Sequence, residues 1–71
     1  MTQAMIRVVL NGEEKTCRAG TTVSEFLETL DLAGRAVAVE INLSVVPKSR
    51  HSSVVLRDGD RIEVVSFVGG G

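Results

Sequence analysis

The sequence predicts an α+β fold, a sheet of short strands with one helix packed on one of its faces. Three observations indicate it. The chain opens on a β-branched run that ends at an Asn-Gly turn, a capping box then starts an apolar stripe with helical spacing, and further β-branched runs follow. With 71 residues the chain has room for one such domain. The helix must bury its apolar stripe, and the sheet is the surface available to it.

The first expected element is a β-hairpin. Met5 to Leu10 is rich in the side chains that favour strands. The Asn11-Gly12 dipeptide that follows tolerates the positive φ angles of a two-residue hairpin turn. The return strand is expected over Glu14 to Arg18, where the apolar content is low. The prediction of a hairpin therefore depends mainly on the first strand and the turn.

The one expected helix begins at Thr22. Thr22 and Glu25 form a capping box, in which each side chain accepts a hydrogen bond from a free backbone N–H of the first turn. Gly34 is expected to close the helix in a left-handed conformation. The apolar stripe that follows the cap consists of Val23, Phe26, Leu27 and Leu30.

Three more strands are expected after the helix. Ala36 to Ile41 alternates as a buried strand, with its larger apolar side chains on one face. Leu43 to Val46 is short and stops at Pro47, which cannot donate to a ladder and so indicates an edge strand. A turn at residues 57–60 leads into the last strand, Arg61 to about Phe67.

The composition is that of a folded domain and argues against nucleic-acid binding. Hydrophobic residues make up 44% of the chain, charged residues 24%, and the formal net charge is −1, so disorder is not expected. The basic residues are scattered singly, and Phe26 and Phe67 are the only aromatic side chains. The sequence thus offers neither a track for a phosphate backbone nor a platform on which bases could stack.

The same residues argue against a membrane or secreted protein. No apolar stretch approaches the roughly 20 residues that span a bilayer, and the first ten residues lack the pattern of a secretory signal. Cys17 is the only cysteine, which excludes an intramolecular disulfide and a multi-thiol metal site. We expect a cytoplasmic protein with a reduced thiol.

No side chain of the sequence forms a convincing catalytic or metal site. Cys17 has no His or basic helix terminus near it in sequence, and we expect a packed or edge thiol. His51 lies in a polar segment and is expected to be solvated. Asp58 and Asp60 flank Gly59, and we interpret them as turn residues whose carboxylates cap local N–H groups.

The sequence ends on Gly69, Gly70 and Gly71, and this is where we expect the chemistry. Glycines offer no side chain to pack, but as a thread they can enter a channel where any Cβ would collide. From Phe67 onwards such a thread reaches on the order of 17 Å when extended. A terminal carboxylate is a poor electrophile until it is converted to an acyl-adenylate. A sulfur nucleophile can then displace AMP and leave a thiocarboxylate.

Several segments together resemble the ThiS-type sulfur carriers of thiamine biosynthesis, which have the β-grasp (ubiquitin-like) fold, a mixed sheet of about five strands with one main helix on one face. The resemblance covers essentially the whole chain. It implies a β-grasp domain over residues 1–66 and a flexible glycine tail over residues 67–71. It is carried by Val9-Leu10-Asn11-Gly12, Thr22-Val23-Ser24-Glu25-Phe26-Leu27, Val37-Ala38-Val39-Glu40-Ile41-Asn42, Val45-Val46-Pro47, Asp58-Gly59-Asp60-Arg61-Ile62-Glu63-Val64-Val65 and Phe67-Val68-Gly69-Gly70-Gly71.

The resemblance also implies a function, with Gly71 as the covalent carrier site and Gly69 and Gly70 in the partner's channel. An adenylating enzyme of the ThiF type, using ATP and Mg²⁺, would act on Gly71. A cysteine persulfide would supply sulfur, and a thiazole synthase of the ThiG type would receive it. The carrier itself would bind no cofactor and catalyse nothing. Phe67 and Val68 either anchor in the partner or, for Phe67, pack back on the carrier's own core.

Other functions remain open at this point. The small subunit of molybdopterin synthase, of the MoaD type, resembles this chain at its tail and uses the same chemistry, but such proteins are usually longer. A β-grasp domain can also be an adaptor that docks partners without covalent chemistry, which leaves the glycines without a purpose. A protein modifier would need the same terminus and amine acceptors.

Overall fold

The computed structural model describes residues 4–67. Its helical and strand elements follow one another much as the sequence predicts. In chain order they are β1 (Met5–Leu10), β2 (Glu13–Arg18), α1 (Val23–Thr29), β3 (Val37–Ile41), β4 (Ser44–Val46), the 3-10 turn η1 (Lys48–Arg50) and β5 (Arg61–Ser66).

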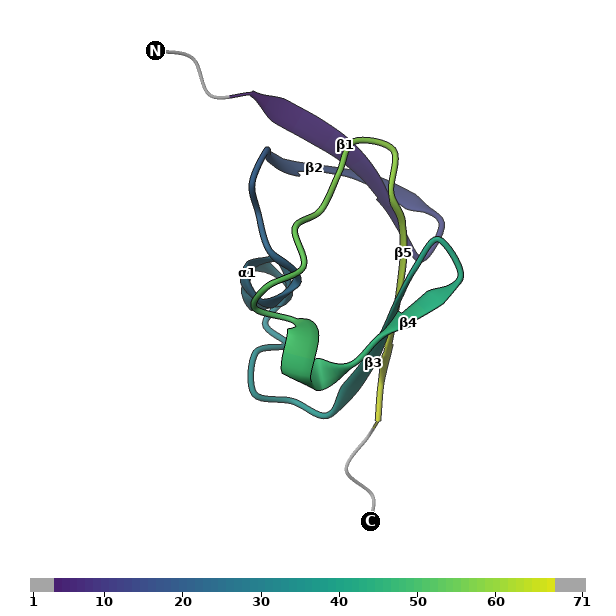
Figure 1. Ribbon diagram of the computed structural model, residues 1–71. Coiled ribbons are helices and arrows are strands. Elements are labelled where there is room, and N and C mark those ends of the chain that lie inside the picture. Colours follow the sequence, from purple (N-terminus) through teal and green to yellow (C-terminus); the bar gives the residue numbers. More distant parts are fainter. Residues whose placement is uncertain (1–3, 68–71) are drawn as a thin grey trace.

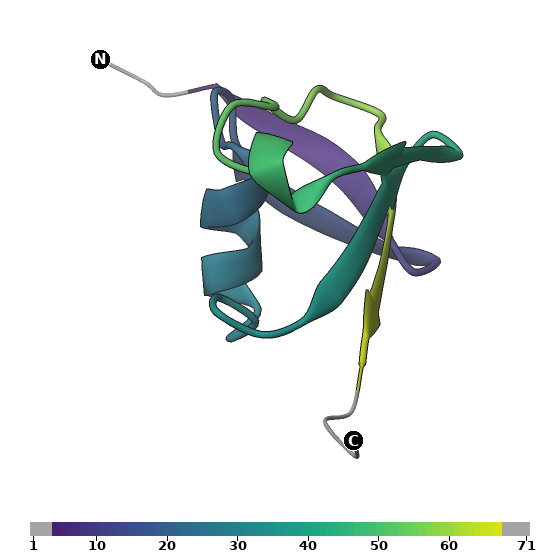
Figure 2. The same ribbon diagram turned by 60° about the horizontal axis from the view of Figure 1, so that its bottom comes forward.

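The strands form one five-stranded sheet in the order β2-β1-β5-β3-β4. Strand β5 pairs parallel to β1 and antiparallel to β3, so the sheet is mixed. Helix α1 covers one face of it (Figures 1 and 2). This arrangement confirms the α+β prediction and is the β-grasp fold. Strand β4 lies at an edge, as the proline after it indicates.

The core lies between α1 and the sheet. The apolar stripe of the helix supplies part of it, and the strands supply the remainder from their inward positions. Leu30, the residue directly after the helix, is half-buried and packs against this core. The buried members of the core are Val8, Leu10, Val23, Phe26, Leu27, Val39, Leu56, Ile62 and Val64.

Two tight turns of the same kind connect neighbouring strands. Asn11 and Gly12 have φ angles of 48° and 84°, which confirms the expected two-residue turn between β1 and β2. Asn42 and Leu43 have φ angles of 52° and 70° and connect β3 to β4 in the same way. Leu43 was expected in the strand and is instead in the turn, in a conformation that bulky side chains rarely adopt.

The N-terminus of α1 is fully hydrogen-bonded, and the capping box is confirmed. The N–H of Glu25 donates to the hydroxyl of Thr22 at 3.2 Å, and the N–H of Thr22 donates to the Glu25 carboxylate at 2.9 Å. The next free donors are satisfied by the segment between β4 and β5, which runs beside α1 (Figure 1). The N–H groups of Val23 and Ser24 donate to the carbonyls of Val54 and His51, each at 2.9 Å.

The C-terminus of α1 differs from the prediction. The left-handed residue that closes the helix is Asp31, with a φ of 60°, and not Gly34, which lies further along in the connecting loop. The N–H of Leu32 donates to the carbonyl of Leu27 at 2.9 Å, and the N–H of Asp31 donates to that of Glu28 at 3.1 Å. This is a Schellman motif. The helix ends early because Leu32, packed against the core, fixes where the chain must turn.

Candidate functional site

The candidate site is the end of β5, the strand that leads into the glycines. Strand β5 is central in the sheet, with β1 on one side and β3 on the other. Strand β5 ends at Ser66, one residue before the expected end, and Phe67 is the last residue described. Val68 and the predicted carrier residues Gly69, Gly70 and Gly71 lie outside the described residues.

The side chain of Asn11 holds β5 where β1 no longer can. Strand β1 pairs with β5 only as far as Leu10 and Ile62 and then turns away. The amide of Asn11 continues the pairing, because its oxygen accepts from the N–H of Val64 at 3.0 Å and its nitrogen donates to the Val64 carbonyl at 3.2 Å. A side chain thus replaces one rung of the backbone ladder.

Asn42, in the other two-residue turn, holds the beginning of the same strand. Its side-chain oxygen accepts from the N–H of Arg61 at 3.0 Å, and its backbone N–H donates to the Arg61 carbonyl at 2.8 Å. Its side-chain nitrogen donates to Asp60 at 3.0 Å. The two turn asparagines therefore fix both parts of the strand from which the tail emerges. Neither role was predicted, because both bonds join segments distant in sequence.

Phe67 continues the ladder but leaves its ring in solvent. Its N–H donates to the carbonyl of Ala36 at 3.0 Å, which extends the antiparallel pairing of β5 with β3 by one residue. The side chain is nevertheless 59% exposed and is not among the core residues. A fixed backbone with an exposed aromatic ring is suited to contact with another protein. The docking role of Phe67 stays a prediction.

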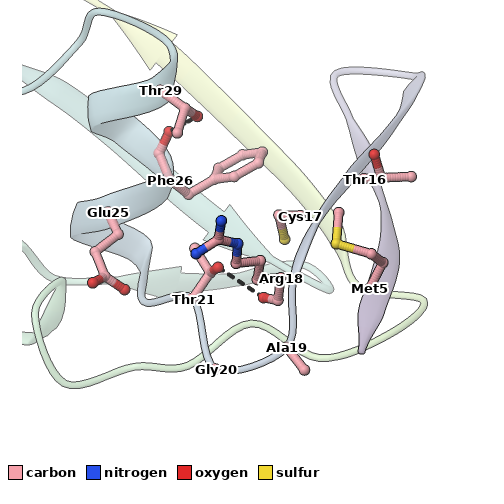
Figure 3. Close-up of a pocket in the computed structure, with 10 residues that line it drawn as sticks. All are labelled: Met5, Thr16, Cys17, Arg18, Ala19, Gly20, Thr21, Glu25, Phe26 and Thr29. Atoms are coloured by element: carbon pink, nitrogen blue, oxygen red, sulfur yellow. Dashed lines mark hydrogen bonds between the residues drawn. The ribbon is translucent and has the colours of Figure 1, made fainter. Parts of the chain in front are cut away.

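Cys17 lies at a hollow between β2 and α1. The hollow has a volume of about 510 Å³, and the walls near the thiol include Met5 and Phe26 (Figure 3). Burial raises the pKa of the Cys17 thiol, and a contact with the Thr21 hydroxyl offsets part of the rise. A raised pKa disfavours the nucleophilic thiolate. The structure therefore places Cys17 as the half-buried thiol of an edge strand, as expected.

Two of the polar groups around this hollow are already used by the fold. The Glu25 carboxylate accepts the N–H of Thr22 in the capping box, and the Thr21 hydroxyl donates to the Arg18 carbonyl at 2.7 Å. No histidine lines the hollow. Neither of these two groups is free to act as a general base for Cys17.

The expectation for His51 is wrong. Its side chain is 6% exposed, and Nε2 lies 3.1 Å from the carbonyl oxygen of Val46. Because the chain folds back against α1 after η1, a residue from a polar segment becomes buried. The polar residues around His51 in the sequence gave no sign of its burial, because the burial results from the packing of helix α1 against this segment.

The Asp58 and Asp60 carboxylates act as turn caps, but only one does so locally. Asp60 accepts the N–H of Arg57 at 2.8 Å within the turn. Asp58 accepts the N–H of Arg7, on β1, at 2.9 Å. Both carboxylates therefore stabilise the connection into β5, and neither is placed as half of an acid–base pair.

Residues 4–67 show neither a gathered set of metal ligands nor a membrane-spanning helix. In that range no group of three His, Cys, Asp or Glu side chains is gathered closely enough to hold a metal ion. None of the helices in the same range has the length and apolar character required to span a bilayer.

The sequence is similar to a known family and to individual proteins. Residues 8–71 match the model of the ThiS family. Over 66 residues the chain is 33% identical to the sulfur carrier protein ThiS of Escherichia coli, covering 93% of this chain and 100% of that protein. It is 47% identical over 66 residues to a thiazole synthase of Paramagnetospirillum magneticum, where it spans 93% of this chain and 20% of the relative.

The fold matches solved structures as well. A crystal structure of the thiamine biosynthesis protein ThiS from Geobacter metallireducens superimposes with a TM-score of 0.78. The two sequences are 30% identical, and the match covers 93% of this chain and 100% of that one. The likeness therefore extends over the whole sheet and helix and is not restricted to one motif.

Proposed function

Because this chain belongs to the ThiS family, we propose that it carries sulfur for thiazole formation in thiamine biosynthesis as a thiocarboxylate on Gly71. As a sulfur carrier of this family it is a protein substrate and not itself a catalyst. The observation that carries the proposal is the family match, which runs from β1 through Gly71. The relatives' names favour this function over the molybdopterin and adaptor alternatives.

The proposed chemistry begins with activation of the carboxylate. A Gly71 carboxylate oxygen attacks the α-phosphorus of ATP on an adenylating enzyme, which forms an acyl-adenylate and releases pyrophosphate. Mg²⁺ on that enzyme would neutralise the phosphate charge. The mixed anhydride has a good leaving group, so its carbonyl carbon accepts a sulfur nucleophile.

Sulfur transfer then follows in two steps. The terminal sulfur of a cysteine persulfide attacks the Gly71 carbonyl carbon and displaces AMP, which leaves an acyl disulfide. A second thiol attacks the sulfur that belongs to the donor cysteine, so the donor and the second thiol become a disulfide. The electron pair of the broken S–S bond stays on the carrier sulfur and gives the thiocarboxylate, the form that can donate sulfide to a thiazole synthase.

The described residues support this proposal by fixing the strand that precedes the tail. The Asn11 and Asn42 side chains fix β5 in the centre of the sheet, so that a thread starting after Phe67 would extend from a rigid base. The glycines add no Cβ that would widen the thread.

A thiazole synthase is the proposed acceptor. A protein of that name contains a segment similar to nearly the whole of this chain within its own longer sequence. Occurrence of both parts in one polypeptide supports the idea that a separate carrier of the same kind works with a separate synthase. The adenylating enzyme and the persulfide donor are proposed on the chemistry alone.

Mass spectrometry of the chain isolated from its own host tests the proposal. A thiocarboxylate is heavier than the carboxylate by the difference between one sulfur and one oxygen atom, and methionine oxidation adds nearly the same mass. Trypsin cleavage after Arg61 releases residues 62–71, which contain neither Met nor Cys. If this peptide carries the mass shift and also reacts with iodoacetamide, the added atom is sulfur and lies in the tail.

The same peptide gives the decisive negative result. Purified chain is incubated with the host's adenylating enzyme, ATP, Mg²⁺ and a persulfide donor, and a variant lacking Gly69, Gly70 and Gly71 is the control. We expect sulfur on the wild-type peptide only. An unmodified wild-type peptide under these conditions would refute the carrier proposal.

A further inference from the structure

Strand β2 forms one edge of the sheet, and among residues 4–67 only β1 lies beside it. We call its other side the free edge. Strand β2 has six residues, whereas β4, at the opposite edge of the sheet, has three. A long edge strand presents a row of backbone N–H and C=O groups that can bond a further strand. The free edge of β2 is therefore the place where this sheet can best be extended.

The backbone groups of Glu14, Thr16 and Arg18 point to the free edge. In a two-residue hairpin the residues on either side of the turn bond each other, and bonded pairs then alternate along the two strands. The even-numbered residues of β2 therefore turn their N–H and C=O groups away from β1. Of these groups, the Arg18 carbonyl already accepts the N–H of Thr21 at 3.2 Å. The groups of Glu14 and Thr16 and the N–H of Arg18 remain for a further strand.

The side chains of the same three residues form a row that is complementary to itself. They alternate with Lys15 and Cys17, whose neighbours on β1 lie in or against the core, so the row is on the face opposite α1. In chain direction the row is acidic, neutral and basic. A second copy of β2 running antiparallel would therefore place Arg18 opposite Glu14 at both ends and Thr16 opposite Thr16 in the middle.

Charge selects this register among those that two-fold symmetry allows. In a symmetric antiparallel pair residues of the same face meet, so the axis passes beside one residue of β2. With the axis at Lys15 or at Glu14, two like charges would be directly opposite each other, which destabilises a sheet. With the axis at Cys17, no opposite charges would pair. Only the axis at Thr16 places Arg18 opposite Glu14.

Arg18 has no ion pair in the described part of the chain, and Glu14 has a weak one. The ion pairs there join Arg7 to Glu14 at 4.0 Å and Lys15 to Glu13 at 3.8 Å. The side chains of Arg7 and Glu14 are 74% and 66% exposed, so their pair contributes little to stability. Charged residues on an edge strand normally hinder the addition of other strands. In β2 their order favours one partner sequence, which is that of β2 itself.

The hollow between β2 and α1 gives a second copy further surface to cover. Its volume is about 510 Å³, and Cys17 and Phe26 both line it (Figure 3). A two-fold axis perpendicular to the sheet keeps both helices on the same face. Lys15 of each copy is then opposite Cys17 of the other. Its aliphatic chain can cover the apolar wall of the hollow while its ammonium group stays in water.

We propose that this chain forms a two-fold symmetric dimer through β2, which joins two sheets into one continuous sheet. The two Thr16 residues exchange backbone hydrogen bonds, the N–H of each Arg18 donates to the Glu14 carbonyl of the other copy, and the side chains of Arg18 and Glu14 form an ion pair at each end.

The dimer is compatible with the proposed function and does not depend on it. Strand β1 separates β2 from β5, the strand that precedes the tail. A second copy bound at the free edge therefore leaves Phe67 uncovered. The dimer would present two tails on one particle, each at the end of its own β5.

Sedimentation equilibrium of the full chain measures this association. An interface built on one pair of strands is small, so we expect a dissociation constant on the order of 0.1 mM. The amide hydrogens of Thr16 and Arg18 should exchange more slowly as the protein concentration rises, because both donate across the free edge. A chain that stays monomeric up to about 1 mM would overturn the proposal.

Two charge reversals test the register. Glu14→Arg and Arg18→Glu each give the row two charges of one sign, so each variant alone should dimerise about tenfold more weakly than the wild type. An equimolar mixture of the two variants should dimerise again, because an acidic row then meets a basic one. The controls Glu28→Arg and Arg57→Glu make the same changes in net charge at exposed positions outside β2 and should dimerise like the wild type. Thermal denaturation checks that all four variants are folded.

Other results would contradict this arrangement. Single variants that dimerise as tightly as the wild type would place the contact elsewhere, for example on β4. A mixture that associates no more tightly than its components would show that the charges do not align the strands. If the wild type is monomeric and both variants show a raised KM for adenylation, the free edge binds the adenylating enzyme and the dimer is wrong. A wild type that dimerises but is not adenylated would support the dimer and refute the proposed function.

Discussion

The side-chain amide of Asn11 bonds both backbone groups of Val64, a residue 53 positions later in the chain. Asn11 also occupies the first position of a two-residue turn, with a φ of 48°. One residue therefore makes the turn that closes β1 and β2 and replaces the missing rung between β1 and β5. These two contributions can be separated by substitution.

Asn11→Gly keeps the backbone conformation and removes both side-chain bonds. We expect it to lower the free energy of unfolding by about 1–2 kcal/mol, since two partly buried backbone groups of Val64 lose their partners. Asn11→Ala should cost about 1 kcal/mol more, because alanine tolerates a left-handed conformation poorly. Urea denaturation measures both. Equal stability of Asn11→Gly and the wild type would contradict the bonding role of the side chain.

Asp31 ends α1 in a left-handed conformation and adds a negative charge at the helix C-terminus, and both are unfavourable. Asp31→Gly should raise the free energy of unfolding by about 1 kcal/mol. Asp31→Asn, which removes only the charge, should gain about 0.5 kcal/mol, and less at high salt. Chemical denaturation at two ionic strengths checks these values. A loss of stability in both variants would show that the Asp31 carboxylate has a favourable contact.

Leu43 and Gly12 occupy the second position of matching turns, and each φ is positive. Leu43 is 90% exposed, so its side chain gains little from packing. Leu43→Gly should therefore stabilise the protein by about 0.5 kcal/mol, after the extra entropy that glycine gives the unfolded chain. Gly12→Leu should destabilise it by about 1–2 kcal/mol, although a Cβ there meets no atom within 4 Å. Thermal denaturation of both variants tests these two predictions. The melting temperature should rise for Leu43→Gly and fall for Gly12→Leu, and changes in the same direction would contradict them.

The two phenylalanines provide a matched comparison of core and surface. Phe26 is 4% exposed and belongs to the core, whereas Phe67 is half-exposed. Phe26→Ala should cost about 3–5 kcal/mol of stability. Phe67→Ala should cost less than about 1 kcal/mol and should raise the KM for adenylation. If the melting temperature of Phe67→Ala falls as far as that of Phe26→Ala, the ring belongs to the core and its docking role is wrong.

The pH profile of Cys17 alkylation tests the burial of its thiol. Burial raises the pKa of Cys17 above the ordinary value of 9.0, so the midpoint of the rate of reaction with iodoacetamide should lie at higher pH in the folded protein than in urea. The pKa of Cys17 is higher in the folded than in the unfolded chain. The contribution of its protonated thiol to the free energy of unfolding is therefore fully present below pH 9.0 and is lost as the pH rises through the pKa of the folded state. The Cys17→Ala variant should lack this loss. Coincident midpoints in both solvents would contradict the effect of burial.

The sequence by itself determined the features that depend on neighbouring residues. The Asn11-Gly12 turn and the Thr22–Glu25 capping box formed as predicted, because their bonds close within a few residues. The strand propensities placed the five strands to within one residue of their bounds, and the capping box placed the start of α1. The glycine tail, the predicted carrier site, is likewise a feature of the sequence alone.

Tertiary structure decided whatever depends on how distant segments meet. The parallel pairing of β1 with β5, the bonds of Asn11 and Asn42 to β5, the burial of His51 beside α1 and the facing of Glu40 and Glu63 all follow from the order and register of the strands. Even the end of α1 at Asp31, and not at Gly34, depends on Leu32 reaching the core. Local propensity cannot specify these contacts, because the energy that selects them comes from burying surfaces that meet only when the whole sheet has formed.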